Sequence, residues 1–279
     1  MTAVLLALLT ALAYGLANYF GPLMTRRHPL GGVLLVGQVV GVLGSAALVA
    51  VRGGAFPDPR HLLLGVVAGI CNGAALALLY TAAAAGPISI VAPIGATGSV
   101  VPVALALATG ERPSLLQLLG IPLAVLGVVL AAARRSSGGA QHAAVRTIVL
   151  AVLSALAFGG FLAAFGAASR DHTSWAVLVS RLALIVCTGA VLLARPIPVR
   201  LPRRELPAVA LPGLLLLIGT VAYGLATTRG LVSVVAVLAT LAPVVTVGLA
   251  VLVLGERLAR PQQLGVAVAL IGVVLLAAG

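Results

Sequence analysis

The chain contains 279 residues, of which 62% are hydrophobic and only 8% are charged. Soluble domains carry roughly 25% charged residues, because much of their surface must face water. The composition therefore excludes an ordinary soluble protein and indicates that the solvent of this chain is lipid. The net charge of +12 comes from 17 arginines without any lysine. Their scatter between apolar runs is typical of membrane proteins and not of a nucleic-acid-binding surface.

Apolar runs of about 20 residues follow one another along the chain, and this is the length that a helix needs to cross a bilayer. The runs lack the alternating pattern of β-barrel strands, so the sequence predicts an all-α integral membrane protein with ten transmembrane helices. We expect the first helix to be retained and not cleaved, because the basic pair Arg26 and Arg27 follows its apolar run. In chain order, the predicted helices cover residues 3–24, 30–51, 61–82, 87–109, 115–133, 147–168, 174–194, 207–228, 231–254 and 261–278.

The arginines outside these runs are distributed unequally between the two membrane faces. Eleven fall on the side opposite the N-terminus and five on the N-terminal side. Because arginine is enriched in cytoplasmic loops, we expect both termini to lie outside the cytoplasm. The arginine-only, alanine- and glycine-rich usage is typical of a GC-rich coding sequence, so we expect the plasma membrane of a bacterium.

The chain repeats itself after about half its length. Gly110–Ala133 and Gly255–Ala278 are identical at 13 of 24 positions, with a Glu, an Arg and a Gln in register. Ala7–Gly15 and Ala151–Gly159 also match, at a shift of 144 residues. Low complexity alone does not explain the recurrence of polar residues, so the sequence indicates an internal duplication.

The repeats predict a first five-helix half over residues 1–135, a linker loop over 136–146 and a second half over 147–279. An odd number of helices in each half makes the second copy cross the membrane in the opposite sense. Inverted repeats of this kind are typical of secondary transporters that bind their substrate between the halves. A duplication that merely built a larger bundle is the alternative.

Paired G-E-R tripeptides at residues 110–112 and 255–257 are each followed by Q-x-x-G and an apolar G-V-V-L helix. Together with Tyr14-Gly15 and Asn18, these motifs resemble the EamA-like transporters of the drug/metabolite transporter superfamily over nearly the whole chain. The resemblance implies a 5+5 helix fold that moves small metabolites, often outwards, without ATP hydrolysis. The first helix lacks the intramembrane Glu of the small multidrug resistance relatives, which argues against proton-driven export of cationic drugs.

Arg181 lies about seven residues inside an apolar run, where inserting an arginine costs on the order of 3 kcal/mol. It is a candidate for binding a substrate anion in a cavity. The alternative is that its long side chain snorkels to the lipid headgroups. Its counterpart in the first half, at a shift of 143 residues, is the polar Gln38, which favours the cavity.

Further polar groups and helix breaks mark candidates for a substrate pathway. Tyr14 and Asn18, four residues apart, share a helix face, although an Asn can also bridge two helices. Prolines interrupt the fourth and ninth predicted helices, which correspond in the repeat, and broken helices often form transporter sites. Nearby hydroxyls can line the pathway or satisfy their own backbone. The pathway candidates are Tyr14, Asn18, Gln38, Pro93, Thr97, Ser99, Arg181, Tyr223, Thr240 and Pro243.

The expected function is a secondary transporter of a small polar metabolite, an exporter that works by alternating access. A single Arg suits a neutral, zwitterionic or anionic substrate better than a cation.

We interpret Glu111 and Glu256 as turn residues with local ion pairing, not as one coupling site. A passive channel or facilitative pore is the alternative, but it needs a continuous polar lining. The sequence shows no metal-ligand cluster or catalytic motif, so we expect no metal, no cofactor, no enzymatic activity and no nucleic-acid partner, with the substrate and the bilayer as partners.

Overall fold

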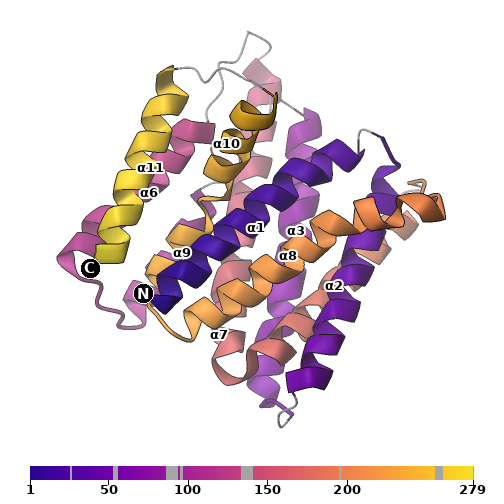
Figure 1. Ribbon diagram of the computed structural model, residues 1–279, viewed down its shortest axis with the longest axis horizontal. Coiled ribbons are helices and arrows are strands. Elements are labelled where there is room, and N and C mark those ends of the chain that lie inside the picture. The colour runs from indigo at the N-terminus through magenta and orange to yellow at the C-terminus, as the bar shows by residue number, and fades with distance from the viewer. Residues whose placement is uncertain are drawn as a thin grey trace.

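The structure is a computed structural model that describes residues 1–25, 27–52, 56–85, 94, 97–132, 141–194, 197–254 and 260–278. Over these ranges the chain is helical and contains no strand, in agreement with the predicted all-α fold. Helices are the expected solution because lipid offers the backbone no hydrogen-bond partner. Figure 1 shows the helices α1 (Thr2–Thr25), α2 (Leu30–Arg52), α3 (Pro59–Ala85), α5 (Val100–Ala108), α6 (Leu115–Ala132), α7 (Gln141–Ala194), α8 (Leu206–Thr227), α9 (Val232–Ala239), α10 (Ala242–Leu254) and α11 (Arg260–Ala278), with the 3-10 turns η1 (Thr97–Ser99) and η2 (Arg203–Glu205).

Every predicted run contains helix, but the division into spans differs from the prediction. The sixth and seventh runs form the single element α7, and the ninth run is divided into α9 and α10. In the described chain, five stretches are long and apolar enough to cross a bilayer: Thr2–Thr25, Leu30–Arg52, Pro59–Leu79, Val145–Ala194 and Arg203–Thr227. Four apolar helices are shorter: Thr97–Ala108, Leu115–Leu130, Val232–Val245 and Arg260–Leu276.

α7 consists of two helices joined at His172, whose φ of −139° and ψ of 99° are not helical. The contacts of α7 with α3 show the direction of each part. With the α7 residue first, the contact pairs are Ser154–Ala75 and Gly160–Cys71 before His172, then Val179–Gly65 and Cys187–Gly73 after it. Along the first part of α7 the residue numbers of the α3 partners fall, and along the second part they rise. The chain therefore reverses its direction at His172.

Three close contacts between helices recur at positions that the sequence repeat relates. In each contact a glycine lets its partner occupy the place where a Cβ would lie. The related contacts are Gly69–Ser180 and Gly213–Gly37, Gly15–Val245 and Gly159–Val101, and Gly127–Ala269 and Gly272–Ala124. If one repeat length is added to the number of the first residue in a contact and subtracted from the number of the second, the result is the related contact in the other half. The similarity of the two halves thus extends from their sequences to their packing.

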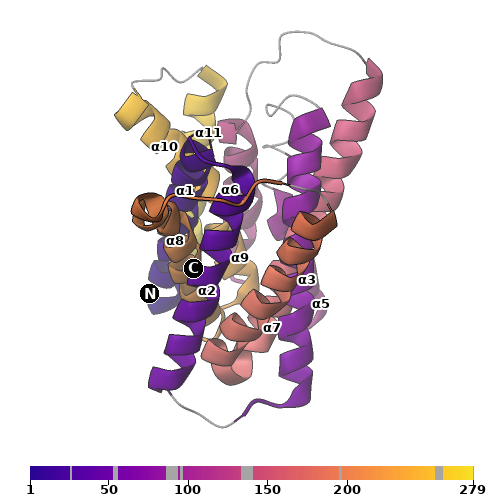
Figure 2. The same ribbon diagram turned by 90° about the vertical axis from the view of Figure 1, so that its right-hand side faces the viewer.

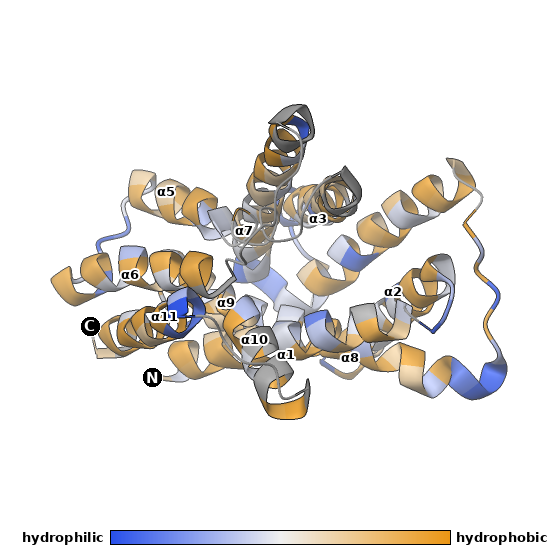
Figure 3. Cartoon of the chain, turned by 90° about the horizontal axis from the view of Figure 1, so that it is seen from above, coloured by the Kyte–Doolittle hydropathy of each residue, from blue (hydrophilic) through white to orange (hydrophobic). Residues whose placement is uncertain are grey.

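The outside of the bundle is apolar. Leu43, Leu63 and Leu193 are 64%, 63% and 90% exposed, and Figure 3 shows hydrophobic residues along nearly every helix. A water-soluble monomer rarely exposes so much apolar surface, so this surface fits a lipid environment. By contrast, all residues of α9 are buried, and Figure 2 shows α9 behind α2 in the middle of the bundle.

Candidate functional site

Three polar side chains from three helices meet inside the bundle. Arg181 Nη2 of α7 donates to Thr220 Oγ1 of α8 over 2.6 Å and to the Leu216 carbonyl over 2.9 Å. Thr220 Oγ1 itself donates to Leu216 over 2.7 Å and lies 3.1 Å from the Tyr14 hydroxyl of α1. A hydroxyl has one hydrogen, so Tyr14 is the donor to Thr220. Tyr14, Arg181 and Thr220 are only 7%, 4% and 2% exposed, so the group is enclosed by protein.

Glycines and a second threonine make this meeting possible. A Cβ on Gly219 would lie 2.6 Å from Cδ1 of Tyr14, and a Cβ on Gly41 would lie 3.2 Å from Cδ of Arg181. In helices that consist largely of Leu, Val and Ala, these two glycines leave room for a phenol ring and an arginine. Thr10, one turn before Tyr14, shares its one hydroxyl hydrogen between the Leu6 carbonyl of α1 at 2.9 Å and the Gly219 carbonyl of α8 at 3.2 Å.

Gln38 of α2 belongs to the same region. It is 5% exposed, and it lies one turn before Gly41, on the helix face that contacts Arg181. Among the described residues its Oε1 atom is buried and has no hydrogen-bond partner, an arrangement that is costly in a folded protein. We refer to Tyr14, Gln38, Arg181 and Thr220 as the polar cluster.

The arginine of the polar cluster has no acidic partner in the described part of the chain. Its Cδ, Nε and Nη1 atoms lie 3.2, 3.6 and 3.8 Å from the place of a Cβ on Gly41, so this side of the arginine packs against α2. The described carboxylates have other partners: Asp171 pairs with His61 and His172, Glu205 pairs with His28 and Arg204, and Asp58 and Glu111 accept backbone N–H groups. A buried charge without a counterion is costly. The burial also rules out snorkelling for Arg181.

Other predicted pathway residues lie apart from the polar cluster or are bonded to the backbone. Tyr223 is fully buried and donates to the Leu162 carbonyl over 3.0 Å. Thr97 and Thr240 donate to the carbonyls of Ile94 and Val237 over 2.7 and 2.8 Å, respectively. Ordinary helix packing therefore accounts for these three hydroxyls.

Ser99 and Asn18 differ from these residues. Ser99 is buried, and its Oγ has no partner among the described residues. Asn18 is exposed, one turn beyond Tyr14. The expected pair of Tyr14 and Asn18 thus does not form one buried group.

The predicted break in the ninth run is present. α9 ends at Ala239 and α10 begins at Ala242, with Thr240 and Leu241 between them. Pro243 stands in the first turn of α10, a position where the missing N–H costs no helical bond. In the fourth run, the turn η1 precedes α5 at the corresponding place of the repeat, whereas Pro93 lies outside the described residues.

Thr220 was not among the residues predicted from the sequence, and the predicted partner of Glu111 was wrong. Thr220 is the group that joins Tyr14 to Arg181, and its only signal was a hydroxyl three residues before Tyr223 in an apolar run. The Glu111 carboxylate accepts hydrogen bonds from the backbone N–H groups of Val232 and Ser233 over 2.7 and 3.1 Å, and from Ser233 Oγ over 2.7 Å. Glu111 therefore caps α9 across the bundle, whereas we expected local ion pairing.

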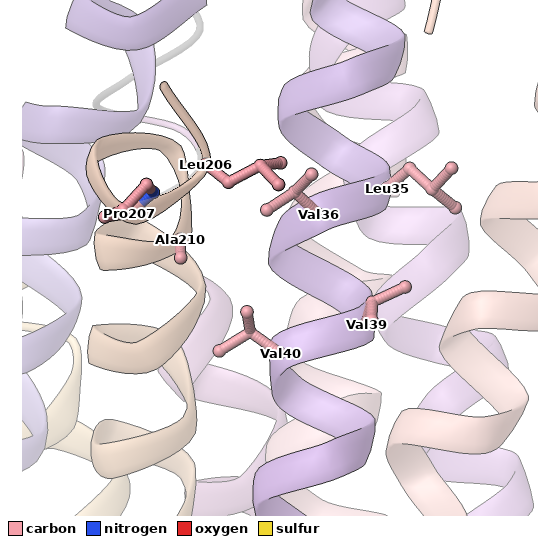
Figure 4. Close-up of a pocket in the computed structure, with 7 residues that line it drawn as sticks. All are labelled: Leu35, Val36, Val39, Val40, Leu206, Pro207 and Ala210. Atoms are coloured by element: carbon pink, nitrogen blue, oxygen red, sulfur yellow. The ribbon is translucent and has the colours of Figure 1, made fainter. Parts of the chain in front are cut away.

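Two hollows lie elsewhere and have apolar walls. A groove of about 410 Å³ between α2 and α8 is lined by Leu35, Val36, Val39, Val40, Leu206, Pro207 and Ala210. Figure 4 shows Val36 and Leu206 facing each other across it. A second hollow of about 390 Å³ lies between α5 and α6 and is equally apolar. Walls without polar side chains cannot orient a polar solute, so the polar cluster is the better candidate site.

Comparison with known proteins supports the resemblance found in the sequence. The model of the EamA-like transporter family matches residues 1–133 and 145–278. An uncharacterised protein of Methanocaldococcus jannaschii is 30% identical over 130 residues, which cover 46% of this chain and 95% of that protein. A protein of known crystal structure has a TM-score of 0.82 and 18% identity, covering 99% of this chain and 98% of the other. At this identity the second likeness concerns the fold alone.

Proposed function

This chain belongs to the EamA-like transporter family, and we propose that it is a secondary transporter that exports a small polar metabolite without ATP hydrolysis. Family membership and the apolar outer surface support a multi-pass membrane protein. The substrate, the direction and the mechanism are our proposal. The single observation that carries it is the polar cluster, a buried charged group between helices from distant parts of the chain.

The proposal includes ten membrane crossings arranged as two inverted halves, residues 1–135 and 147–279. The two family matches have nearly these boundaries. The reversal of α7 at His172 supports two crossings in that element. The repeat-related contacts support a pseudo-two-fold relation, because each contact between a first-half residue and a second-half residue has a mate with the roles exchanged.

The polar cluster lies between these halves. Tyr14 and Gln38 come from the first half, and Arg181 and Thr220 come from the second. Each residue stands well inside its helix and not at an end. A site at this place becomes accessible from one membrane face and then from the other when the halves rock against each other, which is the alternating-access mechanism of inverted-repeat transporters.

A metabolite screen followed by a flux assay tests the proposal. We expect cells that overproduce the protein to secrete more of one polar compound, and cells that lack it to retain that compound. In proteoliposomes, uptake of the labelled compound should saturate and should be driven by counterflow of the unlabelled compound. Linear flux without counterflow would contradict a carrier and would support the alternative of a passive pore.

A further inference from the structure

The groove between α2 and α8 opens to the outside of the bundle. It has a volume of about 410 Å³ and is lined by apolar side chains of both helices, among them Val36, Val39 and Leu206. Val39 and Leu206 are 39% and 38% exposed, and Figure 4 shows the lining side chains of α2 and α8 on the two sides of the groove. In a chain surrounded by lipid, the open side of the groove therefore faces lipid, and an apolar chain can enter it.

One end of the groove lies where both of its helices begin. On α8 the lining starts at Leu206, the first residue of the helix, and on α2 it starts at Leu35, in the second turn. Val199 and Leu201 lie against Gly32 in the first turn of α2, and η2 leads from there into α8. The segment before α8 therefore passes this end of the groove, from one helix to the other.

This segment is basic. Arg200, Arg203 and Arg204 are all exposed, and Figure 3 shows hydrophilic residues at the end of α8 that the segment enters. Glu205 is the acid beside them, and it lies 3.6 Å from Arg204 and 3.9 Å from His28. In the described part of the chain, no acid lies within ion-pair distance of Arg200 or Arg203. Positive charge without a counterion therefore stands at one end of an apolar groove, where the N-termini of α2 and α8 add partial positive charge.

From this arrangement we propose that the groove between α2 and α8 binds an anionic phospholipid of the surrounding bilayer. One acyl chain occupies the groove, and Arg200, Arg203 and Arg204 bind the phosphate of the headgroup. A guanidinium suits a phosphate, because it combines a permanent charge with paired N–H donors. The inference goes beyond the proposed function and does not depend on transport.

The expected orientation of the chain agrees with this occupant. α2 and α8 begin on the face that carries eleven of the arginines outside the apolar runs, which we expect to be cytoplasmic. Anionic lipids give the cytoplasmic leaflet its negative surface potential, and basic pockets between transmembrane helices on that side bind anionic headgroups. A second copy of this chain fits the groove less well, because a two-fold contact would bring the same arginines together.

Lipid binding to the purified wild-type protein in detergent tests the headgroup. The probes are phosphatidylglycerol and phosphatidylcholine with the same acyl chains, titrated by native mass spectrometry. We expect phosphatidylglycerol to bind about 10-fold or more tightly, because it is anionic, whereas phosphatidylcholine has no net charge. Equal affinity for the two lipids, or a dimer that binds neither of them, would overturn the inference.

Charge-removing variants locate the headgroup. Replacing Arg203→Gln and Arg204→Gln together should lower the affinity for phosphatidylglycerol about 10- to 30-fold and leave the affinity for phosphatidylcholine unchanged. The matched control combines Arg52→Gln and Arg60→Gln, which removes the same charge from exposed positions at the end of α2 and the start of α3. Equal losses in the two double variants would show that the charge acts without a defined site and would overturn the inference.

A bulky side chain tests the position of the acyl chain. Val39→Trp places an indole in the groove from its exposed edge, so both lipids should bind several-fold more weakly, because the acyl chain loses its contacts there. The control is Leu43→Trp, one turn further along α2 at a position that is 64% exposed and does not line the groove. Unchanged affinity in a folded Val39→Trp protein would place the acyl chain elsewhere and overturn the inference, whereas the comparison of the two lipids on the wild-type protein does not depend on the folding of any variant.

Discussion

At the scale of single residues, Thr220 occupies the central position of the polar cluster. Its one oxygen accepts from Arg181 and Tyr14 while its one hydrogen goes to the Leu216 carbonyl. A threonine hydroxyl can make no more bonds than these three. Removing this oxygen therefore affects groups on three helices at once, although only one small side chain is changed.

We expect Thr220→Val, which keeps the shape of the side chain, to destabilise the protein by about 1–3 kcal/mol, because buried donors on Tyr14 and Arg181 lose their acceptor. The measurement is thermal unfolding in detergent. Thr228→Val at the exposed end of the same helix is the control, since the Thr228 hydroxyl bonds only to its own helix, at Leu225. Equal unfolding temperatures for the two variants would contradict a stabilising role of the Thr220 hydroxyl between the helices.

At the scale of helices, close approach decides which elements pack together. A Cβ on Gly213 of α8 would lie 2.6 Å from the Cα of Gly37 on α2, and backbone atoms cannot move aside as a flexible side chain can. Gly213→Ala should therefore cost about 1–3 kcal/mol of stability through overpacking. The control is Gly189→Ala, since nothing lies within 4 Å of a Cβ at that position. Thermal unfolding of both variants checks this, and a tolerated Gly213→Ala would contradict the tight contact of α2 with α8.

The start of α9 depends on a residue from a different part of the chain. Glu111 accepts two backbone N–H groups that α9 cannot satisfy internally. We expect Glu111→Gln to reduce stability by about 1 kcal/mol, because a charged acceptor at a helix N-terminus becomes neutral. Glu205→Gln is the comparison: its partners are an exposed Arg204 at 3.6 Å and His28 at 3.9 Å, and surface pairs contribute little. If both variants unfold at the same temperature, the cap contributes nothing measurable.

Hydrophobic runs and turn residues were sufficient to predict an all-helical chain, because a backbone in lipid must form its hydrogen bonds within the protein and the runs lack barrel alternation. They did not predict that the sixth and seventh runs are joined in the single element α7. The sequence also singled out Tyr14, Gln38 and Arg181, because polar groups are rare in such runs. It did not indicate that Tyr14 and Arg181 meet at Thr220, because that depends on how α1, α7 and α8 cross. The cap of Glu111 on α9 was missed for the same reason: its partners, Val232 and Ser233, are more than 100 residues away and carry no motif.

At the scale of the whole molecule, the ends of the chain lie near each other in Figures 1 and 2. This is expected if an even number of crossings separates them. The eleven-to-five distribution of arginines predicts that both termini face away from the cytoplasm. Reporter fusions at Gly279 and within residues 136–140, which lie outside the described residues, should give an external C-terminus and a cytoplasmic loop. The opposite pattern would reverse the orientation and leave the fold unchanged.

The two halves pack alike, but they differ in chemistry where the polar cluster lies. The repeat counterparts of Tyr14 and Thr220, at the shift of 144 residues that relates Gly69 to Gly213, are Phe158 and Leu76, and Gln38 and Arg181 are counterparts of each other. After duplication, therefore, the Tyr14–Thr220 pair has an apolar mate in the other half, whereas Gln38 and Arg181 are both polar and only one of them is charged. Because of this difference, the pseudo-two-fold axis does not convert the inward-open form into the outward-open form at the polar cluster. A solute held at Arg181 would therefore meet different side chains when it enters and when it leaves.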